Sequence, residues 1–181
     1  HSTLNPGGEV AITAGQAHKS SGGDIALTSG KGIASSSGNI ELKTVNAGTD
    51  GVTGKILLKT GDATQTKDAG DIELNAGRGS ATGIGKGGDI SLTAGTSTTV
   101  GGSVMLSAGL SSQTGGLVSI LSGSSSAGNS KLSGTVYMGS ATGSNTGTVD
   151  VASGNASNGE SGNLSMKTGT SSTQPSGDIT V

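Results

Sequence analysis

One short string returns along the whole chain, and this repeat constrains the fold more than any other feature of the sequence. "GGDISLTAG" from Gly87 is matched by "GGDIALTSG" from Gly22, by "AGDIELNAG" from Ala69 and by "SGNLSMKTG" from Ser161. Each copy has a glycine, an apolar residue two positions later and a second apolar residue two positions after that. The sequence contains twelve copies, whose glycines lie 13 to 18 residues apart. This period is typical of proteins built by stacking repeats.

The apolar pairs define the register of the repeat. They are Val10/Ile12, Ile25/Leu27, Ile40/Leu42, Ile56/Leu58, Ile72/Leu74, Ile90/Leu92, Val104/Leu106, Val118/Ile120, Val136/Met138, Val149/Val151, Leu164/Met166 and Ile179/Val181. A small residue follows each pair at the next alternate position, as Ala94 follows Ile90 and Leu92. Alternation with a period of two is typical of a strand with one buried face. The pattern predicts an all-β fold, a thin two-walled parallel β-solenoid of about 12 coils of roughly 15 residues each.

The segments between the pairs are expected to form the second wall and the corners. Small residues two positions after a glycine would face the apolar wall; they are Ala17, Ala63, Ser97, Ser111, Ser125, Ala156 and Ser171. Corner glycines are expected to supply positive φ angles or tight turns. Six Asp or Asn residues are expected to cap these turns, namely Asp24, Asn39, Asp71, Asp89, Asn163 and Asp178. Calcium-binding Gly/Asp repeats have a nine-residue period, so the spacing here does not indicate a metal site.

The composition alone would favour a disordered linker, because 29% of residues are hydrophobic and 36 of the 181 are glycine. The regular spacing of the apolar pairs argues against that interpretation, since nothing constrains apolar positions in a linker. A net charge of -2, without a cluster of basic and aromatic residues, argues against nucleic-acid binding. No run of about 18 apolar residues is present, so no membrane span is expected.

No catalytic, cofactor or metal site is predicted. His1 and His18 have no partners at the spacing of a catalytic or metal site, and the chain contains no cysteine. The string "GRGSATGIGKGG" from Gly77 lacks the order of residues that a phosphate-binding loop needs. We therefore expect a protein that is not an enzyme and that uses no cofactor.

The two ends of the chain suggest contacts along the solenoid axis. The last residues, "SGDITV", stop inside a predicted core strand at Val181, and only "HSTLNPG" precedes the first copy. An uncovered terminal coil offers unpaired backbone groups and apolar side chains. We expect residues 1–181 to form one solenoid domain that continues beyond both ends, in a longer chain or by stacking of identical subunits through Val10, Ile12, Ile179 and Val181. An alternative is that separate covering segments exist outside these residues.

The outer surface suggests two further features. Met105, Leu121 and nearby Tyr137 are expected to project outward in or beside a stretch without charge, where they form either a lateral contact or ordinary surface. Four charged residues, Glu41, Lys43, Lys59 and Glu73, are expected either to pair diagonally between coils or to form a solvated face.

Two sequons would accept N-linked glycans if the chain is secreted. Asn155 lies in a predicted loop and Asn163 begins a predicted strand.

The "GGDIxLTxG" and "SGNIxLKT" units resemble the Gly/Ser/Thr-rich repeat proteins of algae, especially diatoms and related stramenopiles. Similar arrays occur in bacterial surface adhesins and in phage or giant-virus fibre proteins. The resemblance extends over essentially the whole chain and brings no catalytic residues. It implies an extracellular or cell-surface location.

We expect a structural fibre protein whose partner is another copy of itself, with glycans as a possible addition. Two alternatives are a stalk or adhesin region of a cell-surface or virion fibre, and an ice-binding protein. The mixed outer face argues against the latter, which would need a flat array of threonines.

Overall fold

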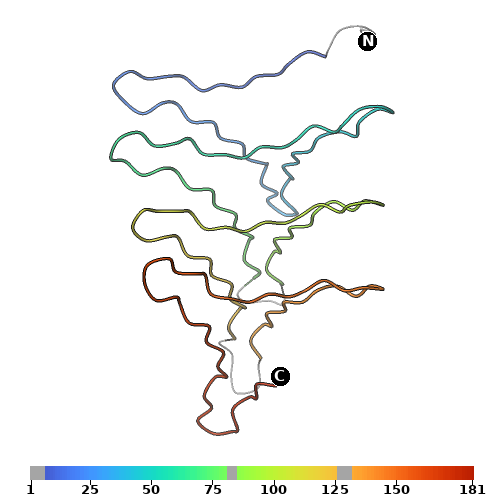
Figure 1. Ribbon diagram of the computed structural model, residues 1–181. Coiled ribbons are helices and arrows are strands. Elements are labelled where there is room, and N and C mark those ends of the chain that lie inside the picture. The colour runs from blue at the N-terminus through green and yellow to red at the C-terminus, as the bar shows by residue number, and fades with distance from the viewer. Residues whose placement is uncertain (1–6, 81–84, 126–131) are drawn as a thin grey trace. The chain divides into compact units, whose positions relative to one another are not determined.

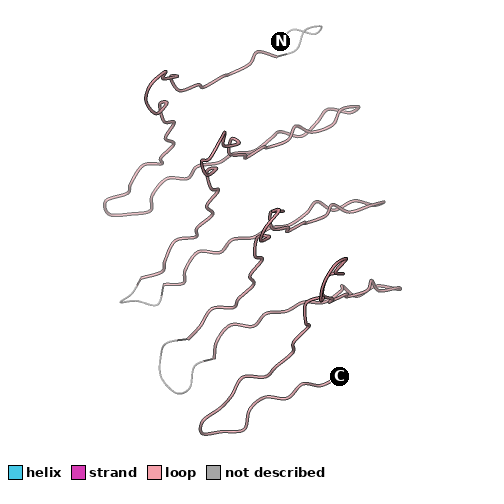
Figure 2. Cartoon of the chain, turned by 60° about the vertical axis from the view of Figure 1, so that its left-hand side comes forward, coloured by secondary structure: helices cyan, strands magenta, loops and turns pink. Residues whose placement is uncertain are grey.

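The computed structural model describes residues 7–80, 85–125 and 132–181 (Figure 1). The chain divides into two units, His1–Ser91 and Leu92–Val181. In the described ranges there is no helix and no strand. Extended segments that contain the apolar pairs alternate with loops (Figure 2).

The two-walled parallel β-solenoid predicted from the sequence is therefore wrong. Its coils would be held by backbone hydrogen bonds between successive repeats and would bury both residues of each pair. Across the described residues, every backbone hydrogen bond instead closes a local loop, and no side chain is buried. The alternating apolar residues lie in the extended segments, but the described segments do not pair into a sheet.

The loops fall between successive apolar pairs. A turn or bend is found at residues 18–20, 33–35, 49–50, 65–66, 98–99, 112–114, 143–145, 157–159 and 172–174. In the turn at 65–66, Gln65 has a φ of 62°. This left-handed region costs a residue with a side chain about 1–2 kcal/mol, because Cβ approaches the following carbonyl oxygen. The repeat period of the sequence thus determines where the chain changes direction.

Most of these loops are closed by the same backbone hydrogen bond. The donor is the N–H of the glycine that begins a repeat, and the acceptor is the C=O of the glycine that ends the preceding extended segment. Six such bonds have N···O distances of 2.8–3.0 Å: Gly23 to Gly15, Gly38 to Gly30, Gly88 to Gly77, Gly102 to Gly95, Gly116 to Gly109 and Gly134 to Gly123. Six repeats are therefore tied to the end of the one before them.

The first glycine of a repeat also allows a close approach between two backbone segments. A Cβ at position 116 would stand 3.2 Å from the Cβ of Ala108 and 3.2 Å from the backbone N of Gly109. A Cβ at position 102 would meet Ala94 in the same way, at 3.3 Å. In the repeats that make this contact, it explains the small residue that follows the preceding apolar pair, because that residue lies against the next glycine.

Corner glycines were expected to supply positive φ angles or tight turns. A positive φ is found at Gly159, which does not begin a repeat. Gly159, with a φ of 148°, is the glycine of this kind in the part of the chain that the structure describes. The glycines that begin the last three repeats, Gly147, Gly162 and Gly177, would accept a Cβ without any atom within 4 Å. The last loops are accordingly more open than the earlier ones.

Replacing Gly116 with valine should open the loop that this glycine closes. The new side chain would press on Ala108 and on the backbone of Gly109, so the hydrogen bond from residue 116 to Gly109 should break. An exposed hydrogen bond contributes about 1 kcal/mol, so the amide of residue 116 should exchange with solvent about fivefold faster, after correction for its intrinsic rate. Amide hydrogen exchange followed by NMR measures this effect.

The matched control is Gly109→Val, at a position where a Cβ meets nothing within 4 Å and the acceptor carbonyl is kept. Equal exchange rates at residue 116 in the two variants would show that the close approach does not hold the loop.

Candidate functional site

The apolar pairs are the recurrent feature of the surface. In the ten interior copies the first residue of each pair is 48–57% exposed and the second is 57–69% exposed. Apolar residues outside the pairs are more accessible, as shown by Leu110 at 100% and Leu132 at 94%. Each pair is thus half covered by its own repeat and offers the rest of its surface to solvent.

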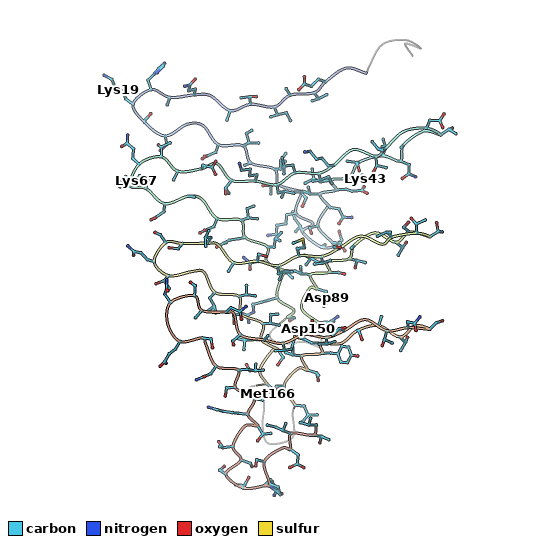
Figure 3. All side chains as sticks on the ribbon, in the orientation of Figure 1. Lys19, Lys43, Lys67, Asp89, Asp150 and Met166 are labelled. Atoms are coloured by element: carbon cyan, nitrogen blue, oxygen red, sulfur yellow. The ribbon has the colours of Figure 1, made fainter. Side chains whose placement is uncertain are left out.

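Because the apolar pairs are exposed, burial of apolar side chains contributes little to the stability of the single chain. Burying a Val, Ile or Leu side chain contributes about 1.5–3 kcal/mol, and no described side chain of this chain is buried. Figure 3 draws these side chains along the ribbon, with Met166, the second residue of an apolar pair, labelled among them. The pairs form a surface that is available to a partner.

The three residues predicted to make lateral contacts are more exposed still. Met105, Leu121 and Tyr137 are 85%, 87% and 85% exposed. Tyr137 lies over its own segment, because a Cβ at Gly139 would stand 2.7 Å from the tyrosine hydroxyl oxygen. All three belong to the second unit, and they are accessible as a lateral contact requires.

The residues predicted to make axial contacts are also accessible. Val10 is 89% exposed, Ile12 71% and Ile179 50%, and Val181 is fully exposed. The interior pairs offer surface of the same kind. The structure therefore does not distinguish the terminal pairs from the others as sites of association.

The described ion pairs join charged side chains two or three residues apart in the sequence. Lys43 Nζ lies 2.8 Å from Glu41 Oε1, two residues away, and Lys86 Nζ lies 2.7 Å from Asp89 Oδ2. Lys59 Nζ lies 3.9 Å from Asp62 Oδ2. The diagonal pairing predicted for Glu41, Lys43, Lys59 and Glu73 is absent from the described ion pairs. Such exposed pairs contribute little stability, but they neutralise charge locally.

Three of the small residues assigned to the second wall have another role. Ser97 Oγ accepts a hydrogen bond from the N–H of Thr99, and Ser111 Oγ accepts one from the N–H of Gln113, both at 3.1 Å. Ser171 Oγ accepts one from the N–H of Gln174 at 3.0 Å. These serines cap the turns, because a hydroxyl close to the backbone satisfies an N–H that has no sheet partner.

The predicted capping by corner Asp and Asn residues is not found in the described residues. Of the six, Asp89 is the one with a hydrogen bond, and its donor is the Lys86 side chain. The sequence carried a signal for the serine caps, since each serine stands two or three residues before its donor in a Gly/Ser/Thr-rich loop. That signal could have been found from turn chemistry alone.

The described residues contain no pocket and no group of three or more His, Cys, Asp or Glu side chains able to hold a metal ion. Within the same ranges no helix has the length and apolarity needed to cross a membrane. His1 and part of the glycine-rich string at 77–88 lie outside the described residues. Both sequon asparagines, Asn155 and Asn163, are exposed.

Comparisons with protein-family models, with curated proteins and with solved structures find no match. The function must therefore be argued from the chain's own surface, on which the half-exposed apolar pairs are the feature that recurs.

The three methionines provide a direct measure of this surface. Met138 and Met166 belong to apolar pairs and are 67% and 69% exposed, whereas Met105 lies outside the pairs. Because oxidation of methionine follows exposure, dilute hydrogen peroxide should oxidise all three at similar rates in the dispersed chain. Peptide mass spectrometry over a time course measures these rates. Strong protection of Met138 and Met166 relative to Met105 would mean that the pairs are buried in the single chain.

Proposed function

We propose that this chain is a repeat segment of an extracellular structural fibre and that its partner is another copy of the same chain. The observation that carries the proposal is the apolar pair, which recurs twelve times and is only half covered in the interior copies. An array of this kind gains free energy when a second apolar array covers it. The role is mechanical and requires no catalytic group.

A second copy is the partner that fits this array. It presents the same pairs in the same order, so each pair can be covered by a pair of equal size. The first unit has eight basic and nine acidic residues, some of them paired with near neighbours as Lys43 is with Glu41, so it provides no strong field to select an oppositely charged partner. Association between copies would therefore be driven by burial of apolar surface.

The proposed location rests on the resemblance of the repeat units to those of surface and fibre proteins. The exposed sequon asparagines, Asn155 and Asn163, would accept glycans there. The loops are rich in Gly, Ser and Thr and would remain hydrated on the outside of a fibre.

Placing charges on one apolar pair should weaken self-association. In the double variant Val118→Asp/Ile120→Asp, two side chains that are 48% and 61% exposed would no longer be buried against a partner. At about 1.5–3 kcal/mol for each side chain, the critical concentration for assembly should rise at least about tenfold. Sedimentation and electron microscopy at moderate salt measure this concentration.

The matched control is Leu110→Asp/Leu132→Asp, which adds the same charge to the same unit at apolar residues outside the pairs. It should assemble as the unmodified chain does. If both double variants shift the critical concentration equally, net charge and not the pairs governs association. An unmodified chain that stays monomeric up to its solubility limit would overturn the proposal.

Lateral contact between fibres is a separate expectation. Replacing Met105 and Leu121 with lysine should reduce the thickness of bundles seen by electron microscopy, while single fibres persist. In assembled material, peroxide should spare Met138 and Met166 where the pairs are covered, and Met105 where bundles form. Bundles of unchanged thickness in the Met105→Lys/Leu121→Lys variant would exclude these residues from lateral packing.

A further inference from the structure

The loop that precedes the repeat beginning at Gly162 is one of the open loops near the end of the sequence, and it contains the glycine with a positive φ. Its bend, at residues 157–159, contains Asn158 and Gly159, and Gly159 has a φ of 148°. No described backbone hydrogen bond closes this loop, and a Cβ at Gly154, Gly159 or Gly162 would meet nothing within 4 Å. The backbone here is neither paired nor packed.

Asn158 has a neighbour that makes its side chain reactive. The sequence contains nine asparagines, and Asn158 is the one that is followed by glycine. The other eight are followed by residues that carry a Cβ, which hinders approach to the backbone nitrogen. Gly159 removes that hindrance, and both residues are exposed to water.

We propose that Asn158 is a site of spontaneous deamidation. The backbone nitrogen of Gly159 attacks Cγ of Asn158, a C–N bond forms, and the side-chain amide nitrogen leaves as ammonia together with the proton of the Gly159 N–H. The product is a five-membered succinimide. Water then opens either of its two carbonyls, which yields aspartate or isoaspartate at position 158. Water is the only co-reactant, and nothing is oxidised or reduced.

The conversion would change the charge of the second unit. From residue 92 onward the sequence has three acidic residues, Asp150, Glu160 and Asp178, and two basic residues, Lys131 and Lys167. A carboxylate at position 158 would be the fourth acidic group and would stand two residues from Glu160. The isoaspartate product also adds a methylene to the main chain. Ageing of the chain would thus add negative charge to a region that has little of it.

The rate of isoaspartate formation at position 158 can be compared with that at a second site in the same chain. Asp50 is also followed by a glycine, Gly51, but a carboxylate is a poorer electrophile than an amide. In addition, the Gly51 N–H is donated to the Gly48 carbonyl oxygen at 3.4 Å. Position 50 should therefore form isoaspartate more slowly than position 158.

The test is to incubate the purified chain in neutral and mildly alkaline buffer and to map its peptides over time. Trypsin releases residues 132–167 as one peptide with four asparagines, so fragmentation in the mass spectrometer must locate the change. The expected result is the mass gain of an amide converted to a carboxyl group at position 158 first, at a rate that rises with pH. An isoaspartate-specific methyltransferase should label the same peptide.

Three variants distinguish this reaction from general damage. Asn158→Gln should lose the mass gain, and Gly159→Ala should slow it several-fold. Asn155→Gln, three residues away in the same open loop, should leave it unchanged. The proposal would be overturned if position 158 stays intact while Asn155 or Asn163 converts as fast, or if Gly159→Ala converts at the rate of the unmodified chain. None of these readouts depends on self-association.

Discussion

The close approach of a glycine to the end of the preceding segment organises this chain. At Gly116 the backbone comes near enough to Ala108 and Gly109 that a Cβ would be crowded, and the same N–H closes the loop through a hydrogen bond. In the six loops that are closed in this way, the glycine N–H and C=O groups beside the loop bond to each other. The described extended segments have no backbone hydrogen bonds to one another, and their apolar pairs remain half exposed.

The exposed pairs follow from this local closure. A β-solenoid needs hydrogen bonds between residues one full repeat apart, and the cost of ordering each coil is offset only when its neighbours cover it. In this chain the described backbone hydrogen bonds span 11 residues or fewer, as between Gly88 and Gly77. The single chain therefore gains little free energy from apolar burial. The proposed association with a second copy would supply that burial.

The sequence predicted the local features of this structure better than the long-range ones. The positions of the glycines located the loops, because close backbone approach is a local property that small residues such as Ala94 and Gly102 reveal. The apolar alternation at Ile90 and Leu92 identified an extended segment, but alternation records only which side chains share a face. Alternation does not identify the segment whose backbone lies beside the extended segment, so it was not sufficient to predict a parallel sheet. The pairing of Lys86 with Asp89 was missed because Asp89 was expected to hydrogen-bond the turn backbone, whereas its carboxylate accepts from a lysine three residues away.

The unequal spacing of the repeats bears on how two copies would match. Gly70 and Gly88 are 18 residues apart, whereas Gly88 and Gly102 are 14 apart. The loops between successive pairs therefore differ in length, so a shift of one repeat would set a long loop of one copy beside a short loop of the other. Two copies in register would cover every pair, while shifted copies would cover some pairs and strain the loops between others. Apolar contacts alone are not directional, but an irregular array favours one register over the neighbouring ones. A surface of repeated Val, Ile, Leu and Met side chains could in this way select a defined arrangement of the proposed partner copy.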